Sequence, residues 1–188
     1  ADRRPLWSPK GDKVAWFSDN THENYVVKIT SPDGLSNAED ISIGESKMAW
    51  EPVWSPDAAH IAFVDNKLRV RVLDLKTKTI KTVDTGGINI ERGNMGLSWS
   101  PDSKWLAYSK TGDNNFRRIM LWALANNRVK PATNTFADSF SPAWDRSGKH
   151  LYFLASTDLA LRSGWTNTSS MSTNPEYAAY VINLDNTD

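Results

Sequence analysis

The sequence has no cysteine, no net charge and no apolar run long enough to cross a membrane. The lack of cysteine in 188 residues excludes disulfides, thiolate metal sites and a cysteine nucleophile. The 22 basic and 22 acidic residues give no general attraction for nucleic acid or an anionic membrane surface. A membrane helix needs about 18 consecutive apolar residues. We therefore expect no nucleic acid partner and no membrane span.

Motifs of common catalytic sites are also missing. The chain has no Gly-x-Ser-x-Gly elbow, phosphate-binding glycine loop, His-Glu-x-x-His zinc helix or calcium loop. Its three histidines, His22, His60 and His150, are scattered, and the last two follow the same repeated turn. We expect this segment to be non-catalytic, with no cofactor and no metal. The lack of cysteine favours a periplasmic or other extracytoplasmic location, with the cytoplasm as the alternative.

What the chain does contain is nine tryptophans, four of which recur in a repeated hairpin. The hairpins read RRPLWSPKGDKVAWF (3–17), WEPVWSPDAAHIAF (50–63), GLSWSPDSKWLAY (96–108) and SFSPAWDRSGKHLYF (139–153). The repeated residues are Trp7, Trp54, Trp99 and Trp144, at intervals of 47, 45 and 45 residues. A period of about 40–45 residues centred on tryptophan is typical of four-stranded propeller blades. We expect these rings to be structural and to fill the seams between neighbouring sheets.

The turn within each hairpin has its own residue requirements. In Ser-Pro-Asp-x, proline sets φ at the second position and glycine suits a left-handed fourth position. Glycine stands there only as Gly11 and Gly148, whereas Ala58 and Ser103 replace it. We expect those two turns to be strained or differently shaped.

Each repeat contains up to four β-rich runs, A to D from the inside outward. The D run is visible in three repeats only, as DISIG (40–44), IKTVD (80–84) and VKPAT (129–133). The sequence therefore predicts an all-β fold, one partial β-propeller domain over 1–188, with four-stranded blades at about 1–47, 48–92, 93–137 and 138–188. The last blade lacks its D strand. Since the chain starts with Ala1 and has no closing strand, we expect an open arc cut from a larger ring.

The Trp-Ser-Pro-Asp hairpins resemble the repeats of the Tol-Pal translocation propeller and of the tricorn protease family. The stretches SWSPDSKWLAYSK, NTFADSFSPAWDRSGKHLYFLASTDLALRSGW and YVINL resemble the end of the second, seven-bladed propeller of bacterial tricorn-like proteases. This resemblance implies a propeller segment of a serine peptidase that guides or filters peptides and docks downstream PDZ and protease domains. Two alternatives stay open: an interaction propeller of the Tol-Pal type, and the propeller cap of a prolyl-oligopeptidase-type hydrolase.

Strand direction places the candidate binding residues. The D–A and B–C connections of a propeller emerge on one face, because strands A and C run opposite to B and D. The binding candidates on this rim are Arg92, Asp138, Ser139, Arg162 and Trp165. The partner there is a peptide or a protein. The long B–C insertion over 156–178 is a docking element, a flexible loop or a ligand contact.

Two pairs of arginines complete the candidates. Arg117 and Arg118 start a C strand. Either they form an exposed strand end, or they act as a clamp that binds a peptide carboxylate. Arg69 and Arg71 share one strand face by the period of two, which salt bridges between blades would explain. The outer faces of the first and last blades are expected to expose apolar surface and to support self-association.

Overall fold

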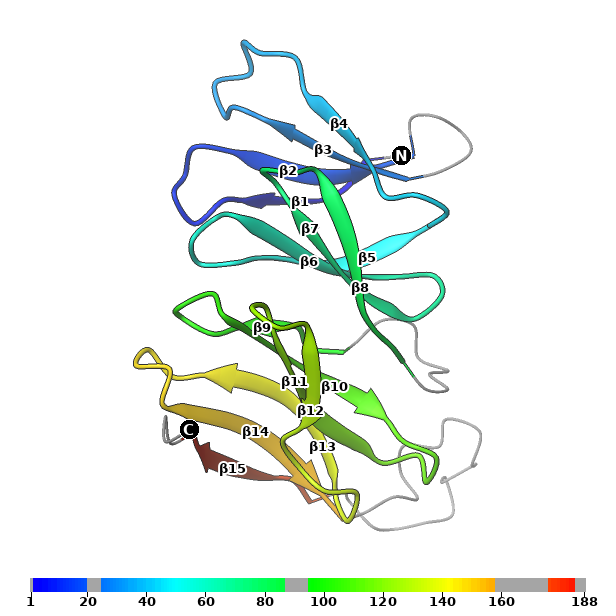
Figure 1. Ribbon diagram of the computed structural model, residues 1–188, viewed down its shortest axis with the longest axis vertical. Coiled ribbons are helices and arrows are strands. Elements are labelled where there is room, and N and C mark those ends of the chain that lie inside the picture. Colours follow the sequence, from blue (N-terminus) through cyan, green and yellow to red (C-terminus); the bar gives the residue numbers. More distant parts are fainter. Residues whose placement is uncertain (1, 20–24, 87–94, 158–175, 185–188) are drawn as a thin grey trace. The chain divides into compact units, whose positions relative to one another are not determined.

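The computed structural model describes residues 2–19, 25–86, 95–157 and 176–184. These residues form β-strands, turns and short connections, and none of their segments is a helix that could cross a membrane. The chain divides into two compact units, Ala1–Thr85 and Gly86–Asp188. Each unit contains two antiparallel sheets (Figure 1).

The first unit contains two four-stranded sheets. In each sheet the strands lie in chain order, so that every strand pairs with its neighbours in sequence. The first sheet consists of β1 (Asp2–Trp7), β2 (Val14–Ser18), β3 (Val26–Thr30) and β4 (Glu39–Ser42). The second consists of β5 (Ala49–Trp54), β6 (His60–Asp65), β7 (Arg69–Asp74) and β8 (Thr79–Thr85).

The second unit contains one four-stranded and one three-stranded sheet. The third sheet consists of β9 (Ser98–Trp99), β10 (Trp105–Thr111), β11 (Arg117–Ala123) and β12 (Arg128–Pro131). The fourth consists of β13 (Asp138–Trp144), β14 (His150–Ser156) and β15 (Ala178–Asn183). The predicted all-β class is confirmed, and so is the incomplete last blade: among the described residues, no strand follows β15 in its sheet.

A hydroxyl–carboxylate hydrogen bond closes each repeated A–B turn. Ser55 donates to Asp57 over 2.5 Å in the second sheet, and Ser100 donates to Asp102 at the matching positions over 2.6 Å. In the first turn Lys10 stands at the aspartate position, and Ser8 donates instead to Asp12, two residues later, over 2.6 Å. In the fourth turn the two residue types exchange places, and Ser147 donates to Asp145 over 2.5 Å. The same bond thus forms although the sequence order of its partners is reversed.

The fourth position of these turns is left-handed in all four repeats. Gly11 and Gly148 have φ values of 71° and 72°, and Ala58 and Ser103 adopt 61° and 60°. The turns were expected to be strained or differently shaped, and their shape is kept because the non-glycine residues adopt the glycine conformation. The expected strain is present, since a Cβ atom disfavours this region.

A second left-handed position lies three residues before each repeated tryptophan. It is occupied by Arg4, Glu51, Gly96 and Ser141, with φ values of 54°, 52°, 62° and 53°. The register of β1, β5 and β13 shifts at this point, as in a β-bulge. At Gly96 a Cβ atom would lie 3.4 Å from Pro142 Cδ, so this position also brings two neighbouring A segments close together.

The repeated tryptophans differ in burial. Trp54 and Trp99 are 8% and 7% exposed, and Trp144 is partly buried with its indole N–H donating to the Ser98 carbonyl over 3.0 Å. Trp7 is 62% exposed, so the expectation that all four are core residues is wrong for this one. Trp54 belongs to the core shared by the first two sheets. Trp7 has the matching place in the first sheet, and no described sheet precedes it.

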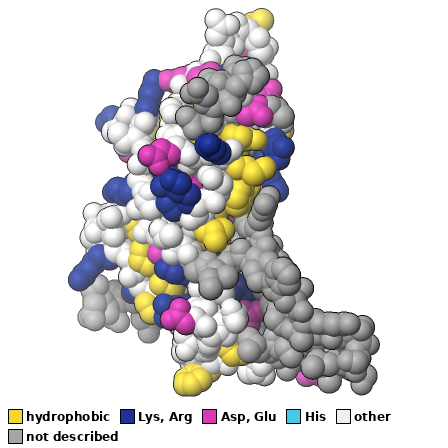
Figure 2. Space-filling model, turned by 90° about the vertical axis from the view of Figure 1, so that its right-hand side faces the viewer, with side chains coloured by type: hydrophobic (Ala, Val, Ile, Leu, Met, Phe, Trp, Pro, Cys, Tyr) yellow, Lys and Arg dark blue, Asp and Glu magenta, His cyan; other side chains and the backbone are white. Residues whose placement is uncertain are grey.

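The outer face of the fourth sheet is apolar and exposed. Tyr152 and Leu154 on β14 are 48% and 37% exposed, and Val181, opposite Tyr152, is 50% exposed. The matching β2 residues, Ala15 and Phe17, are each 1% exposed, and Phe17 packs edge-on against Phe63 of the next sheet at 5.5 Å. Figure 2 shows hydrophobic side chains reaching the surface among charges of both signs.

Candidate functional site

A buried ion pair joins the third and fourth sheets at the end predicted to form the rim. Arg117, at the start of β11, donates from Nε and Nη2 to the two carboxylate oxygens of Asp138, each over 2.8 Å. The Arg117 main-chain N–H donates to Asp138 Oδ1, also over 2.8 Å. The side chains are 11% and 6% exposed. The bidentate geometry fixes the start of β13 against β11.

Aromatic rings extend this ion pair along β13. The Arg117 guanidinium lies 4.0 Å from the ring centre of Phe140, which contacts Tyr177 edge-on at 5.4 Å. Burial raises the pKa of Asp138 to about 6, whereas the three N–H donors favour its charged form. Arg117, Asp138, Phe140 and Tyr177 are here named the rim cluster.

The second sheet has a corresponding polar cluster around a fully buried carboxylate. Asp65, at the end of β6, accepts hydrogen bonds from Arg69, Arg71 and Ser46, at distances between 2.5 and 3.1 Å. Main-chain N–H groups of Lys67 and Arg69 bind its other oxygen. Burial alone would raise the pKa of Asp65, but the hydrogen bonds from Arg69, Ser46 and the main chain together lower it.

These two clusters change the predictions made for Arg117 and for the pair Arg69 and Arg71. Arg117 is neither an exposed strand end nor a free clamp, because Asp138 already occupies its guanidinium. Arg69 and Arg71 do share a face, but both bind Asp65 of their own sheet rather than a neighbouring blade. Ion pairs between sheets are formed instead by Arg117 with Asp138 and by Lys78 with Glu39. Spacing could not reveal the pair of Arg117, since Asp138 lies 21 residues away.

The predicted rim residues fall into two groups. Asp138 and Ser139 are buried, at 4% and 3% exposure, and the Ser139 hydroxyl donates to the Ala137 carbonyl. Asp138 pairs with Arg117, and little of either Asp138 or Ser139 is exposed to a ligand. Arg92, Arg162 and Trp165 lie outside the described residues, so their binding roles stay predictions.

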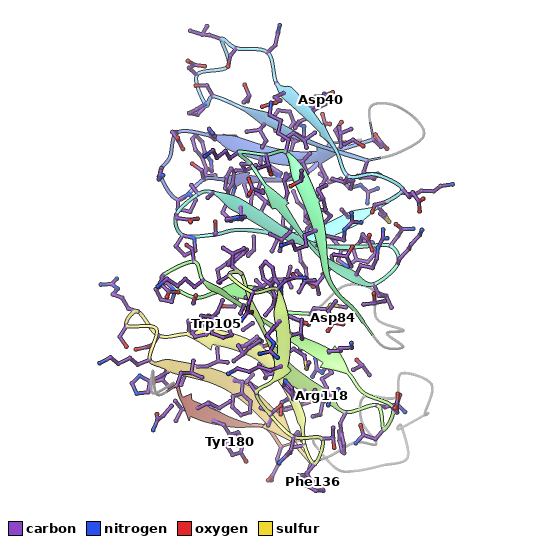
Figure 3. The ribbon with its side chains drawn as sticks, viewed as in Figure 1. Asp40, Asp84, Trp105, Arg118, Phe136 and Tyr180 are labelled. Atoms are coloured by element: carbon purple, nitrogen blue, oxygen red, sulfur yellow. The ribbon has the colours of Figure 1, made fainter. Side chains whose placement is uncertain are left out.

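A cavity of about 390 Å³ lies at the opposite end of the second unit, beside the A–B turns. Trp105, Leu121 and Lys130 from the third sheet line one side, and Trp144 and Leu184 line the other. Trp105 is labelled in Figure 3. The Lys130 ammonium lies 5.3 Å from the centre of its ring. Sequence reasoning did not find this cavity. Among the described residues, no cluster of three or more histidine or acidic side chains could hold a metal ion.

The fold and the repeat chemistry agree with the match to a family model. The model of the tricorn protease second β-propeller domain matches residues 1–175. The chain belongs to this family. The tricorn protease homolog 1 of Streptomyces coelicolor is 28% identical over 146 residues, which cover 76% of this chain and 13% of that protein. The tricorn protease of Thermoplasma volcanium is 25% identical over 167 residues, covering 80% and 16%.

Solved structures show the same propeller fold. A crystal structure of the tricorn protease superposes with a TM-score of 0.71 and 19% identity, over 97% of this chain and 17% of that chain. TolB from Acinetobacter baumannii gives a TM-score of 0.59 and 22% identity, over 95% and 40%. The tricorn family segment described here therefore spans a small part of its curated relatives. The activity of whole tricorn proteins does not transfer to it directly.

Proposed function

We propose that this chain is a non-catalytic propeller segment of a tricorn-type serine peptidase, in which it guides peptides and docks the protease domains. The observation that carries this proposal is the family match over 175 residues. The segment would act by binding and orienting chains that another domain cleaves.

The structure offers a rigid frame for that role. Asp65 and the Arg117–Asp138 pair lock the B–C and D–A ends of the second, third and fourth sheets through charge-assisted hydrogen bonds. Loops that start from fixed strand ends can present side chains to a peptide at a low ordering cost. The connection with Arg162 and Trp165 follows β14, whose last residue Ser156 pairs with Asp138. Arg92 follows β8, whose last residue Thr85 pairs with Arg69.

The recognition chemistry follows from those residue types. Arginine guanidinium groups can bind peptide carboxylates in a bidentate manner, and a loop tryptophan offers a large apolar contact. A peptide with an acidic end and an apolar neighbour is therefore the substrate class that the proposed rim suits.

The purified chain alone tests this function. Fluorescent peptides of eight to twelve residues, with free or amidated C-termini, would be titrated and then analysed by mass spectrometry. We expect weak binding that favours the free carboxylate, with the peptides intact. Cleavage of the peptides by this chain, or equal binding of both peptide forms to it, would contradict the proposal.

A further inference from the structure

The second and third sheets carry opposite charges at one matching position. Ile61 of β6 and Leu106 of β10 each pair with the repeated tryptophan of their own sheet. Four residues later along these strands stand Asp65 and Lys110, which therefore hold matching positions. A carboxylate of the second sheet is thus replaced by an ammonium group in the third.

The arginine opposite this position is present in both sheets. The pairing of β6 with β7 places Arg69 opposite Asp65, and the pairing of β10 with β11 places Arg118 opposite Lys110. Asp65 accepts hydrogen bonds from Nε and Nη2 of Arg69, over 2.8 and 2.5 Å. Like charges directly opposite each other on two strands are destabilising, so Arg118 lacks the stabilisation that Arg69 receives.

The guanidinium group of Arg118 has a donor without an acceptor. Its Nε–H is buried, and no described residue accepts a hydrogen bond from it. Within the described part of the chain Arg118 forms no ion pair, and the residue is partly exposed. A buried donor that is left unpaired costs free energy, so an added acceptor at this place would be bound favourably.

The surroundings of Arg118 strengthen its attraction for an anion. Side chains alternate along a strand, so Arg118 lies on the face of β11 opposite to Arg117. Tyr108 and Met120, the next residues on the Arg118 face, are 1% and 6% exposed. Charges beside buried groups are screened less than charges in open water. Figure 3 shows Arg118 at the end of the third sheet away from Trp105, where the B–C connection begins.

We propose that Arg118 and Lys110 form a binding site for a carboxylate of a bound peptide. The carboxylate takes the place that Asp65 holds in the second sheet and accepts hydrogen bonds from the Nε–H and an Nη–H of Arg118. Lys110 adds a second positive charge. A peptide C-terminus and an acidic side chain share this chemistry. The inference rests on the proposed function in naming a peptide as the source of the carboxylate.

Acetate is the simplest probe of this site. In the full 188-residue chain, the NMR signal of the Arg118 Nε–H would be assigned by its loss in Arg118→Gln. We expect sodium acetate to shift this signal, and sodium chloride at the same ionic strength to leave it in place. Equal shifts with both salts, or no shift with acetate, overturn the site, because the arginine then binds no carboxylate from solution.

Lys110→Asp is the most informative variant, because it gives the third sheet the carboxylate of the second. We expect this variant to lose the acetate shift. Its Tm should rise by about 2–4 °C, since an ion pair replaces two like charges. Lys149→Asp, at an exposed lysine in the A–B turn of the fourth sheet, is the control and should keep the acetate shift. An acetate shift that persists in Lys110→Asp overturns the assigned position.

Three blocked tripeptides then identify the source of the carboxylate: one with a free C-terminus, its C-terminal amide, and an amide with an internal aspartate. We expect the free-carboxylate peptide to bind about tenfold more tightly than the neutral amide, and Arg118→Gln to remove this preference. Tighter binding of the aspartate peptide than of the neutral amide assigns an acidic side chain as a second source.

The outcomes separate this inference from the proposed function. A preference for the free carboxylate that persists in Arg118→Gln overturns the site and leaves peptide guidance standing. An acetate shift without binding of any peptide supports the carboxylate site, but it overturns a peptide as the source and contradicts peptide guidance.

Discussion

Arg117 and Asp138 join two sheets of the second unit through a bidentate pair with two distances of 2.8 Å. The carboxylate also accepts the Arg117 main-chain N–H, so both of its oxygens are bound. The start of β11 is therefore held against the start of β13.

Removing one partner of this pair should strongly destabilise the second unit. Arg117→Ala leaves a buried carboxylate without its counter-charge, and we expect a loss of about 3–5 kcal/mol in the free energy of unfolding. Lys28→Ala, which breaks the more exposed Lys28–Asp40 pair, should cost less than about 1 kcal/mol. Urea unfolding of both variants measures the difference. Equal losses would show that Arg117–Asp138 behaves as a surface pair.

The buried Asp65 should make stability depend on acid pH. Its pKa is lowered from 3.8, so its contribution is fully present above that value and is lost as pH falls through the lower folded value. In Asp65→Asn this component should be missing, and the free energy of unfolding should fall less steeply below about pH 4. Asp113→Asn, on an exposed turn, is the control. Parallel pH profiles for Asp65→Asn and the unaltered chain would refute this role.

The left-handed turn residues offer a stabilising change. Ala58→Gly relieves the Cβ strain at φ 61° and should raise stability by about 0.5–1 kcal/mol. Ala59→Gly, one residue later and outside the left-handed region, should instead lower it through the entropy of the unfolded chain. Thermal unfolding distinguishes the two, and destabilisation by both would mean that Ala58 is not strained.

The hairpin tryptophans should differ in how much each contributes to the free energy of unfolding. Trp54→Ala opens a cavity in the core between the first two sheets and should cost about 3–5 kcal/mol. Trp7→Ala removes a ring that is 62% exposed and should cost well under half of that. Denaturant midpoints of the two purified variants provide the comparison. Similar losses would mean that Trp7 is as buried in solution as Trp54.

The sequence predicted the sheets well because the signals were local and repeated. Tryptophan spacing, turn residues and alternating apolar runs located the hairpins, and the missing D run predicted the three-stranded last sheet. The exchanged Ser147–Asp145 bond shows that one hydrogen bond can be made by two sequence orders. The order of residue types in the sequence alone does not show that Asp145–Ser147 forms the same hydrogen bond as the Ser–Asp pairs of the other turns.

The sequence did not predict features that depend on distant partners or on backbone conformation. The sequence predicted Asp138 as a binding residue because it placed Asp138 on a connection at the rim. Nothing in the sequence indicated that Arg117 would be its ion-pair partner. The left-handed Arg4, Glu51 and Ser141 carry no glycine signal, and only Gly96 in the third repeat could have indicated a left-handed residue at this position. The cavity is lined by residues as distant in sequence as Trp105, Lys130 and Leu184, so only the packing of the third and fourth sheets reveals it.

The central claim, that this segment guides peptides for a tricorn-type peptidase, is tested most directly in the full-length parent. Residues 160–175 would be replaced by a short Gly-Ser linker, and hydrolysis of long and short peptides would be measured together with thermal stability. We predict unchanged stability and an altered ratio of long to short peptide hydrolysis. Reduced stability with an unchanged ratio would contradict the claim, because the segment would then serve only to complete the fold.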